Sequence, residues 1–388
     1  MTITDTISRQ KTRSPRFVWT LNELSGALGD LGLFIPIVIS LIAINGMNPS
    51  LLLTTFGFFF VTNGLAFGIP IPIEPMKEIS AIAIANGYTA DTVMLAGMFT
   101  GISILALTVT GLLTRLQRLI PISVIRGIQM GLGISLAAKG FAMIGKTPLI
   151  GFDSILLAVL SALFIFASFR RQFPAALALV AVGAAITVMI HPEVVRDSGF
   201  TPWTPALTLP LAANVLTSLN LSLAQIPLTL TNSLIATTGL LRTRYGDRAP
   251  SVQSIGKSVG LMSLIAPLFG GIGMCHGAGG VAAWHRFGAK TGASMIMFGA
   301  VLVGLGVFAG GFVFEIMRVF PLSILGTLLL FVAFELARQS RDIRRPTDWS
   351  VVAVTAIVGF AYNMLIGVLI GLSIAYLLRF REKRLIVR

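Results

Sequence analysis

Apolar stretches of roughly 20 residues recur along the chain from Leu24 to Leu378, with short polar turns between them. A helix of that length crosses ~30 Å of hydrocarbon, which is the thickness of a bilayer core. The pattern therefore predicts an integral membrane protein with about fourteen membrane segments. The expected segments lie near residues 24–46, 50–68, 70–87, 91–113, 121–142, 151–169, 174–190, 217–240, 252–269, 271–288, 292–314, 319–337, 347–361 and 363–379.

The third and the tenth of these segments break the helical pattern in their first halves. Segment three starts with Gly68-Ile-Pro-Ile-Pro-Ile-Glu-Pro75, whose three prolines exclude a regular helix and favour an extended strand. Segment ten starts with a glycine-rich run from Gly270 to Gly280, which also weakens helix. Each segment is expected to be half strand and half helix. Because non-helical backbone cannot face lipid, both should line a cavity enclosed by protein.

Segments three and ten occupy matching places, the third of each set of seven, and cross the membrane in opposite directions. This pattern indicates an inverted repeat with a binding site near the middle of the bilayer. Segments one and eight also match, since each contains an Ile-Pro pair in mid-span, at Pro36 and Pro227. The expected fold is an all-α polytopic membrane protein of two seven-segment inverted repeats. Its two half-strand, half-helix segments should meet at the midplane.

Composition and charge favour a membrane location and argue against a nucleic-acid partner. Of the 388 residues, 55% are hydrophobic and 11% are charged, and the formal net charge is +14. The basic residues form short clusters at segment ends, which is the positive-inside pattern and not a nucleic-acid-binding stripe. Of the 29 Lys and Arg, only Lys146, Arg196 and Arg318 fall in loops on one side, four lie within segments, and the remaining 22 fall on the other side. Both termini are therefore expected in the cytoplasm, and the chain in the inner or plasma membrane of the cell.

This topology divides the chain into five parts. The basic stretch at the N-terminus has no apolar core or cleavage site, so it is not expected to be a signal peptide. The parts are a cytoplasmic tail at 1–20, a first repeat at 21–190, an extracytoplasmic connector at 191–212, a second repeat at 213–380 and a cytoplasmic tail at 381–388.

The residue types present exclude several chemistries. A single cysteine, Cys275, cannot form an internal disulfide, and one Cys with three His is too few for a structural zinc site. No Gly-Lys-Ser/Thr of a P-loop occurs, so ATP is not expected to drive the protein. The 15 acidic residues are scattered, whereas a membrane-bound isoprenoid-type transferase would need an Asp-rich metal motif. Neither an enzyme nor a bound cofactor or metal is expected.

Two half-helices that start near the bilayer centre would create an anion site. Each N-terminus has unpaired N–H groups and carries roughly half a positive charge. Two such termini aimed at one point attract an anion without a full cation. The residues at the two expected termini are Glu74, Pro75, Met76 and Lys77 in segment three, and Cys275, His276 and Gly277 in segment ten.

Four stretches of the chain resemble the molybdate transporter family, a relative of the sulfate permease superfamily. The resemblance covers roughly Glu23 to Gly292 and implies secondary transport of a tetrahedral oxyanion: molybdate, sulfate or tungstate. It also implies a core domain, 21–113 plus 213–314, and a gate domain, 119–190 plus 319–380. The four stretches are Glu23–Gly32 with Ile35-Pro36, Phe67–Lys77, Gln225–Ser233, and Met274–Gly280 continuing through Arg286–Gly292.

One residue departs from the family pattern, which usually has Gln before Pro-Met-Lys where this chain has Glu74. An ionised carboxylate and a bound dianion at one half-helix terminus repel each other. The carboxyl group is therefore expected to take a proton before or with the substrate, which would make the protein an oxyanion–proton symporter. Asp30 and His276 are the other candidates for the proton carrier. The alternative for Glu74 is a structural charge paired with Lys77.

Segment eight supplies Gln225, Thr229 and Asn232 at i, i+4 and i+7, on one face of an α-helix. If they face the half-helix ends, they would be neutral donors to oxyanion oxygens; otherwise such residues only join helices. His276 would either donate to the oxyanion or cap its half-helix, and Cys275 is expected to be a small packed side chain. The prolines expected to shape the site are Pro36, Pro72 and Pro227.

Other functions stay open. The same fold would suit a carrier for a nucleobase or a carboxylate, although the half-helix ends lack the aromatic residues on which a base would stack. An anion channel would have the same motifs, and only saturation of the flux separates it from a carrier. The choice among the oxyanions and assembly as a homodimer also stay open.

Overall fold

Helices make up most of the residues that the computed structural model describes, which are 15–116, 119–171, 174–198 and 207–386. Parts of the expected tails and connector, namely 1–14, 199–206 and 387–388, lie outside these residues. The elements of the first half are α1 (Leu21–Ala27), the 3-10 turn η1 (Leu28–Asp30), α2 (Leu31–Asn45), α3 (Pro49–Phe67), β1 (Ile73–Pro75), α4 (Lys77–Asn86), α5 (Ala90–Val109), α6 (Leu113–Leu116), α7 (Ile122–Ile144), α8 (Ile155–Arg171), α9 (Ala175–Ile190) and α10 (Glu193–Asp197).

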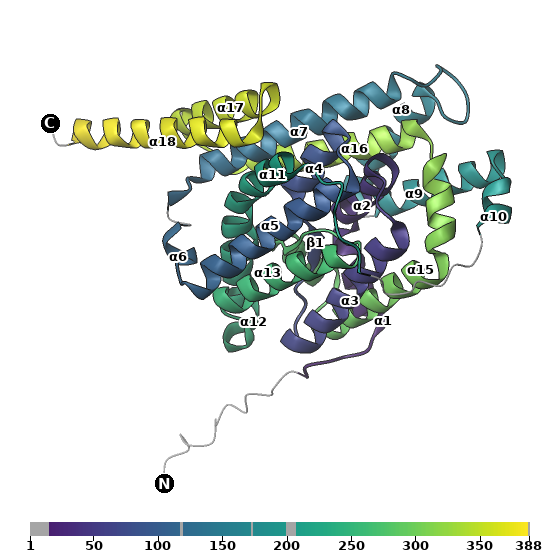
Figure 1. Ribbon diagram of the computed structural model, residues 1–388, viewed down its shortest axis with the longest axis horizontal. Helices are drawn as coiled ribbons and strands as arrows, with labels where there is room; N and C mark the ends of the chain where they lie inside the picture. The colour runs from purple at the N-terminus through teal and green to yellow at the C-terminus, as the bar shows by residue number, and fades with distance from the viewer. Residues whose placement is uncertain (1–14, 117–118, 172–173, 199–206, 387–388) are drawn as a thin grey trace, which may run out of the picture.

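The second half follows the same sequence of long helices with one strand among them. In Figure 1, α17 and α18 project side by side at one edge, α8, α9 and α10 lie at the opposite edge, and β1 lies among helices in the middle. The elements are α11 (Val215–Leu228), the π-helix η3 (Thr229–Ala236), α12 (Thr237–Tyr245), η4 (Gly246–Arg248), α13 (Val252–Leu268), β2 (Met274–His276), α14 (Ala278–Phe287), α15 (Ala293–Arg318), α16 (Leu322–Arg338), η5 (Gln339–Asp342), α17 (Pro346–Ala361) and α18 (Met364–Ile386).

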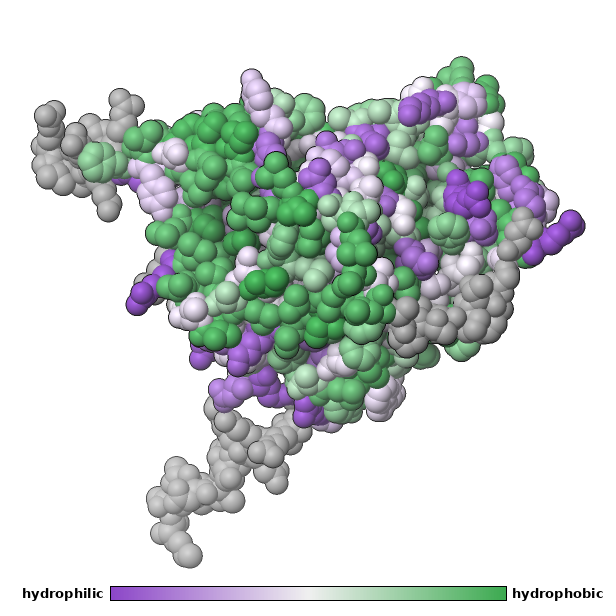
Figure 2. Space-filling model, viewed as in Figure 1, coloured by the Kyte–Doolittle hydropathy of each residue, from purple (hydrophilic) through white to green (hydrophobic). Residues whose placement is uncertain are grey.

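Several helices have the length and the surface of membrane-spanning segments. Hydrophobic residues cover the broad middle of the face seen in Figure 2, with hydrophilic clusters toward its edges. Exposed apolar side chains of this extent require a lipid environment or a partner. Among the described residues, six helical stretches are long and apolar enough to cross a membrane: Leu21–Asn45, Pro49–Phe67, Ala90–Val109, Ile122–Ile144, Ala293–Arg318 and Leu322–Asp342.

The two half-strand, half-helix segments are present, as the prolines and glycines predict. β1 and β2 pair as a two-stranded antiparallel sheet with Glu74 opposite Cys275. The ladder continues where the N–H of Met76 donates to the carbonyl of Gly273 at 3.1 Å. α4 begins directly after β1, and α14 begins directly after β2. The strand pairing therefore fixes the start of one half-helix beside the start of the other.

The helices pack in two groups. In one group α3 packs against α15, and α5 packs against α13 and α11. In the other, α7 packs against α16 and α17, α17 packs against α18, and α8 packs against α16. The groups meet where α4 contacts α7 and where α2 contacts α16.

Glycine pairs allow the closest helix contacts in both groups. A Cβ placed on Gly140 of α7 would lie 2.7 Å from the carbonyl oxygen of Gly326 in α16, and a Cβ on Gly326 would lie 2.7 Å from that of Gly140. Gly57 of α3 and Gly299 of α15 meet in the same way. Backbones this close gain van der Waals contact, which drives helix association in a membrane.

Candidate anion-binding site

A cavity of about 610 Å³ opens where the two half-helices begin. One wall comes from η1, β1, α4, η3 and α14, and the facing wall comes from α16 and η5. α14 therefore faces α16 across open space, whereas α4 is packed against α7. The polar and charged residues in the lining are Asp30, Glu74, Lys77, Asn232, Glu335, Arg338, Gln339 and Arg341.

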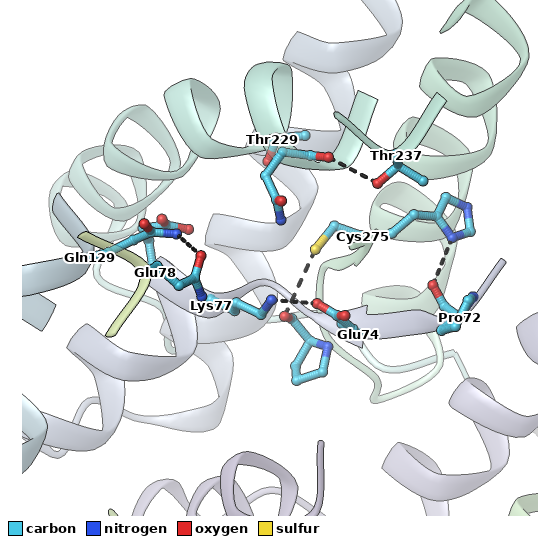
Figure 3. A network of polar contacts seen from close by, with 12 residues as sticks. Pro72, Glu74, Lys77, Glu78, Gln129, Thr229, Thr237 and Cys275 are labelled. Carbon is cyan, nitrogen blue, oxygen red and sulfur yellow. Dashed lines mark hydrogen bonds and ion pairs between the residues drawn. The ribbon is translucent and has the colours of Figure 1, made fainter. Parts of the chain in front are cut away.

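Glu74 and Lys77 form a buried ion pair at the inner end of this cavity. Lys77 Nζ lies 2.6 Å from Glu74 Oε2, and the two side chains are 6% and 2% exposed. Figure 3 shows them reaching toward each other from β1 and the first turn of α4. The Glu74 carboxylate also lies against Gly277, at the N-terminus of α14. A negative charge thus already occupies the position that the second half-helix favours for an anion.

Asp30 brings a second carboxyl group to the same point. A Cβ placed on Gly280 would lie 2.7 Å from Glu74 Oε1 and 2.9 Å from Asp30 Oδ2. Both carboxyl groups therefore lie beside the same point of α14. Two carboxylates at this range repel each other, and Lys77 is the cation beside them.

Gln225 and Thr229 do not reach the cavity. Gln225 Oε1 accepts hydrogen bonds from the N–H groups of Glu78 at 3.0 Å and of Ile79 at 3.4 Å, so it caps the start of α4. Its amide nitrogen donates to Thr229 Oγ1 at 3.0 Å. Both side chains are fully buried. Two of the free N–H groups at the start of α4 are therefore bonded to Gln225 and are not available to an anion.

Asn232 lines the cavity although Gln225 and Thr229 do not, because segment eight is not a regular α-helix there. Residues Thr229–Ala236 form a π-helix, which starts just after Pro227, a residue with no N–H to donate to the helix. The wider turn breaks the i, i+4, i+7 register expected from the sequence. Gln225 and Thr229 are directed to α4, and Asn232 is directed to the cavity.

His276 and Cys275 are held inside the protein. His276 Nδ1 lies 3.0 Å from the carbonyl oxygen of Pro72, and its Nε2 lies 3.1 Å from Ser258 Oγ. Both ring nitrogens are thus engaged, and the ring connects β2 to α13 and to the strand segment before β1. Cys275 is 3% exposed, with Sγ 3.9 Å from the carbonyl oxygen of Pro75. This placement favours a structural role for His276 and Cys275.

The remaining predicted residues shape the walls. Pro75, Met76 and Gly277 are buried at the two strand–helix junctions. Pro36 lies within α2 and Pro227 within α11, as the sequence predicts.

The sequence reasoning missed the residues of α16 and η5 and one buried acid of α4. Arg338 pairs with Glu335 at 2.8 Å, and both line the cavity together with Arg341. The sequence does contain a signal for Glu335, because it is an acidic residue within an apolar segment. Glu78 is fully buried, and its carboxylate oxygens have no hydrogen-bond partner among the described residues.

Two adjacent glycines of α14 allow a matched test of the carboxyl pair. We expect Gly280→Ala to lower the thermal stability of the purified protein and its anion affinity, because the new methyl group would displace both carboxyl groups. Gly279→Ala is the control, since a Cβ there meets nothing within 4 Å. Both changes gain about 1 kcal/mol of helix propensity. Equal melting temperatures for the two variants would contradict the close approach at Gly280.

Comparisons with known proteins identify the family of the chain. A family model described as a molybdate transporter of the MFS superfamily matches residues 22–136 and 217–336. Molybdate transporter 2 of Arabidopsis thaliana is 34% identical over 385 residues, which cover 87% of this chain and 82% of that protein. Molybdate transporter 1 of the same plant is 30% identical, covering 90% and 86%.

Solved structures show the fold. The transmembrane domain of the cyanobacterial bicarbonate transporter BicA superposes with a TM-score of 0.64 at 18% identity, covering 90% of this chain and 97% of that domain. The murine anion transporter Slc26a9 in its inward-facing state superposes with a TM-score of 0.66 at 15% identity, covering 95% and 70%. The relatives are transporters and not enzymes. This chain is an integral membrane transporter and belongs to the molybdate transporter family.

Proposed function

We propose that the protein is a secondary active transporter of a tetrahedral oxyanion, with molybdate as the first candidate and sulfate and tungstate as analogues. The observation that carries the proposal is the cavity at the paired half-helices, where Lys77 and the N-terminus of α14 face an acid pair. The names of the molybdate transporters that this chain resembles support the choice of substrate.

We propose that transport is coupled to protons through Asp30 and Glu74. At the half-helix ends, the dianion meets one positive charge, Lys77, which the acid pair neutralises when it holds one proton; Arg338 and Arg341 line the part of the cavity formed by α16 and η5. A second proton taken up by the pair would remove its charge and leave Lys77 free for the substrate. Substrate and proton would then bind together, and uptake would be favoured at low external pH.

The packing supports a seven-plus-seven inverted repeat. If the repeats match segment by segment, α3, α5 and α7 correspond to α13, α15 and α16. The contact of α3 with α15 then corresponds to that of α13 with α5, and both occur. The contacts of α7 with α16 and of β1 with β2 each correspond to themselves. The pattern of contacts is therefore the same when the two repeats are exchanged, as two-fold pseudosymmetry requires.

We propose that the first packing group is the core, 21–113 plus 213–314, and the second is the gate, 119–190 plus 319–380. Because the strands join the two half-helices, α4 and α14 would move together with the substrate between them. The cavity opens beside Arg338 and Arg341, on the side where most basic residues fall, which corresponds to an inward-open state by the positive-inside rule.

The direct test is calorimetry of the purified protein with molybdate, tungstate, sulfate and uracil in turn, followed by uptake into proteoliposomes. We expect binding of at least one oxyanion, no binding of uracil, and uptake that saturates with substrate concentration. Binding of uracil alone would favour the nucleobase carrier. Flux that rises linearly without saturation would favour a channel.

Asn232 gives a prediction specific to the site. Loss of one neutral donor to a charged ligand costs about 1.5–3 kcal/mol, so Asn232→Ala should weaken oxyanion affinity by ~10–150-fold without lowering the melting temperature. The control is Thr231→Val on the neighbouring position, where the hydroxyl donates to the carbonyl of Pro227 at 2.8 Å. Wild-type affinity in the Asn232 variant would remove this residue from the site.

A further inference from the structure

A second cavity, of about 460 Å³, lies at the opposite end of α4. Its walls are the C-terminal end of α4, the second half of α7, the start of α11 and the turn between α17 and α18. It therefore lies between the two packing groups, as the first cavity does, but at the other end of the contact between α4 and α7. Lys77, at the start of α4, lines the first cavity, and Ile82 is the first residue of α4 that lines this one.

The lining of this second cavity has the composition of an anion site. Lys139 is its one cation, and neither Asp nor Glu is among the lining residues that the structure describes. No ion pair joins Lys139 to a carboxylate within the described part of the chain. The other polar groups are hydroxyls and amides, from Asn86, Tyr88, Ser135, Thr217, Asn220, Tyr362 and Asn363.

The position of Lys139 also favours contact with water or an anion. It lies within α7, one of the helices long and apolar enough to span a membrane, five residues before the helix ends at Ile144. An ammonium group at that depth is costly unless it faces an aqueous cavity or an anion. Asn363 also lines the cavity, and its Oδ1 accepts from the N–H of Leu365 at 2.8 Å, so its NH₂ group is the part that could donate to a ligand.

We propose that this cavity is an outer anion-binding site, in which Lys139 attracts the oxyanion before it reaches the central site. The proposal rests on the proposed function and on the orientation that the positive-inside rule gives. Few basic residues fall on that side, with Lys146, Arg196 and Arg318 in the loops there. A single charge inside a cavity with low-dielectric walls then dominates the local field. The ligand class is a small oxyanion, held by one ammonium group and several amides and hydroxyls.

The test measures uptake of labelled molybdate by cells that express Lys139→Met, Lys139→Arg or wild-type protein. We expect Lys139→Met to raise KM by about 5- to 20-fold at low ionic strength, with a smaller ratio at 0.15 M salt, because salt screens a charge in an open cavity. The maximal rate should stay within about twofold of wild type. Lys139→Arg keeps the charge and should keep KM near wild type, which also shows that the position tolerates substitution.

Two controls separate the outer site from the rest of the protein. Lys146→Met removes a nearby loop charge that does not line the cavity and should leave KM unchanged. Calorimetry of purified Lys139→Met should give the wild-type affinity at the central site, since that site lacks Lys139. An unchanged KM in Lys139→Met, or an equal loss of calorimetric affinity, would overturn the proposal. Absence of transport by wild-type protein would instead refute the proposed function.

Discussion

Lys77→Met is expected to abolish oxyanion binding and to destabilise the protein by about 3–5 kcal/mol. The change leaves the Glu74 carboxylate without its partner in a position that is almost fully buried, and removal of one member of a buried ion pair costs that much. The loss of stability should be smaller at low pH, where a proton on Glu74 removes the unpaired charge. Thermal unfolding in detergent at pH 5 and pH 8 measures the effect on stability, and calorimetry measures binding.

The double variant Glu74→Gln/Lys77→Met distinguishes the two roles of Lys77. It removes both charges, so stability should return toward that of wild type, since neutral groups replace the pair. Oxyanion binding should stay absent, because no cation remains at the half-helices. Recovery of binding in the double variant would show that Lys77 only neutralises Glu74 and does not bind the substrate.

Glu74→Gln alone is expected to keep oxyanion binding and to flatten its pH dependence. If the acid pair takes up one proton with the substrate, wild-type affinity rises as pH falls, by at most ~10-fold per pH unit. With Gln at position 74, Asp30 is the only carboxyl group left at that point, and Lys77 loses the carboxylate that pairs with it at 2.6 Å. Affinity should then change by less than about threefold between pH 5 and 8.

The control for this experiment is Glu193→Gln, an exposed carboxylate that pairs with His191 and lies outside the cavity. Its pH profile should match that of wild type. Parallel profiles for wild type and Glu74→Gln would exclude Glu74 as the proton carrier. Asp30→Asn would then be the next variant, because His276 has both ring nitrogens engaged inside the protein.

Local sequence signals predicted the most unusual part of the fold. Prolines 70, 72 and 75 exclude a regular helix and the glycines from Gly270 to Gly273 weaken one, and the chain forms short strands at Ile73–Pro75 and Met274–His276. A half-helix follows at Lys77 because good helix formers come next, and a second one begins at Ala278 although Gly279 and Gly280 lie in its first turn. These signals are local in the chain, which is why the sequence suffices to locate the two segments.

The parts of the site that could not be predicted depend on contacts between distant segments. Nothing near Asp30 in the sequence indicates that its carboxyl group meets that of Glu74. The role of Gln225 also depends on a contact between distant segments. As a polar residue that faces a half-helix, it is expected from the sequence to bind the substrate, but it caps that half-helix instead. The π-helix at Thr229–Ala236 changed the register of Asn232, and the i, i+4, i+7 pattern assumed a regular helix.

The unequal covering of the two half-helices has a thermodynamic consequence. α4 is packed against α7, whereas α14 is separated from α16 by the cavity. If the proposed inverted repeat and core–gate motion hold, the opposite state would bring α14 onto α16 and release α4 from α7, so each state would gain one helix contact and lose an equivalent one. The free-energy difference between the states is then a small remainder of two similar terms. An oxyanion and a proton that bind one state more tightly than the other by only a few kcal/mol then suffice to decide which state is populated.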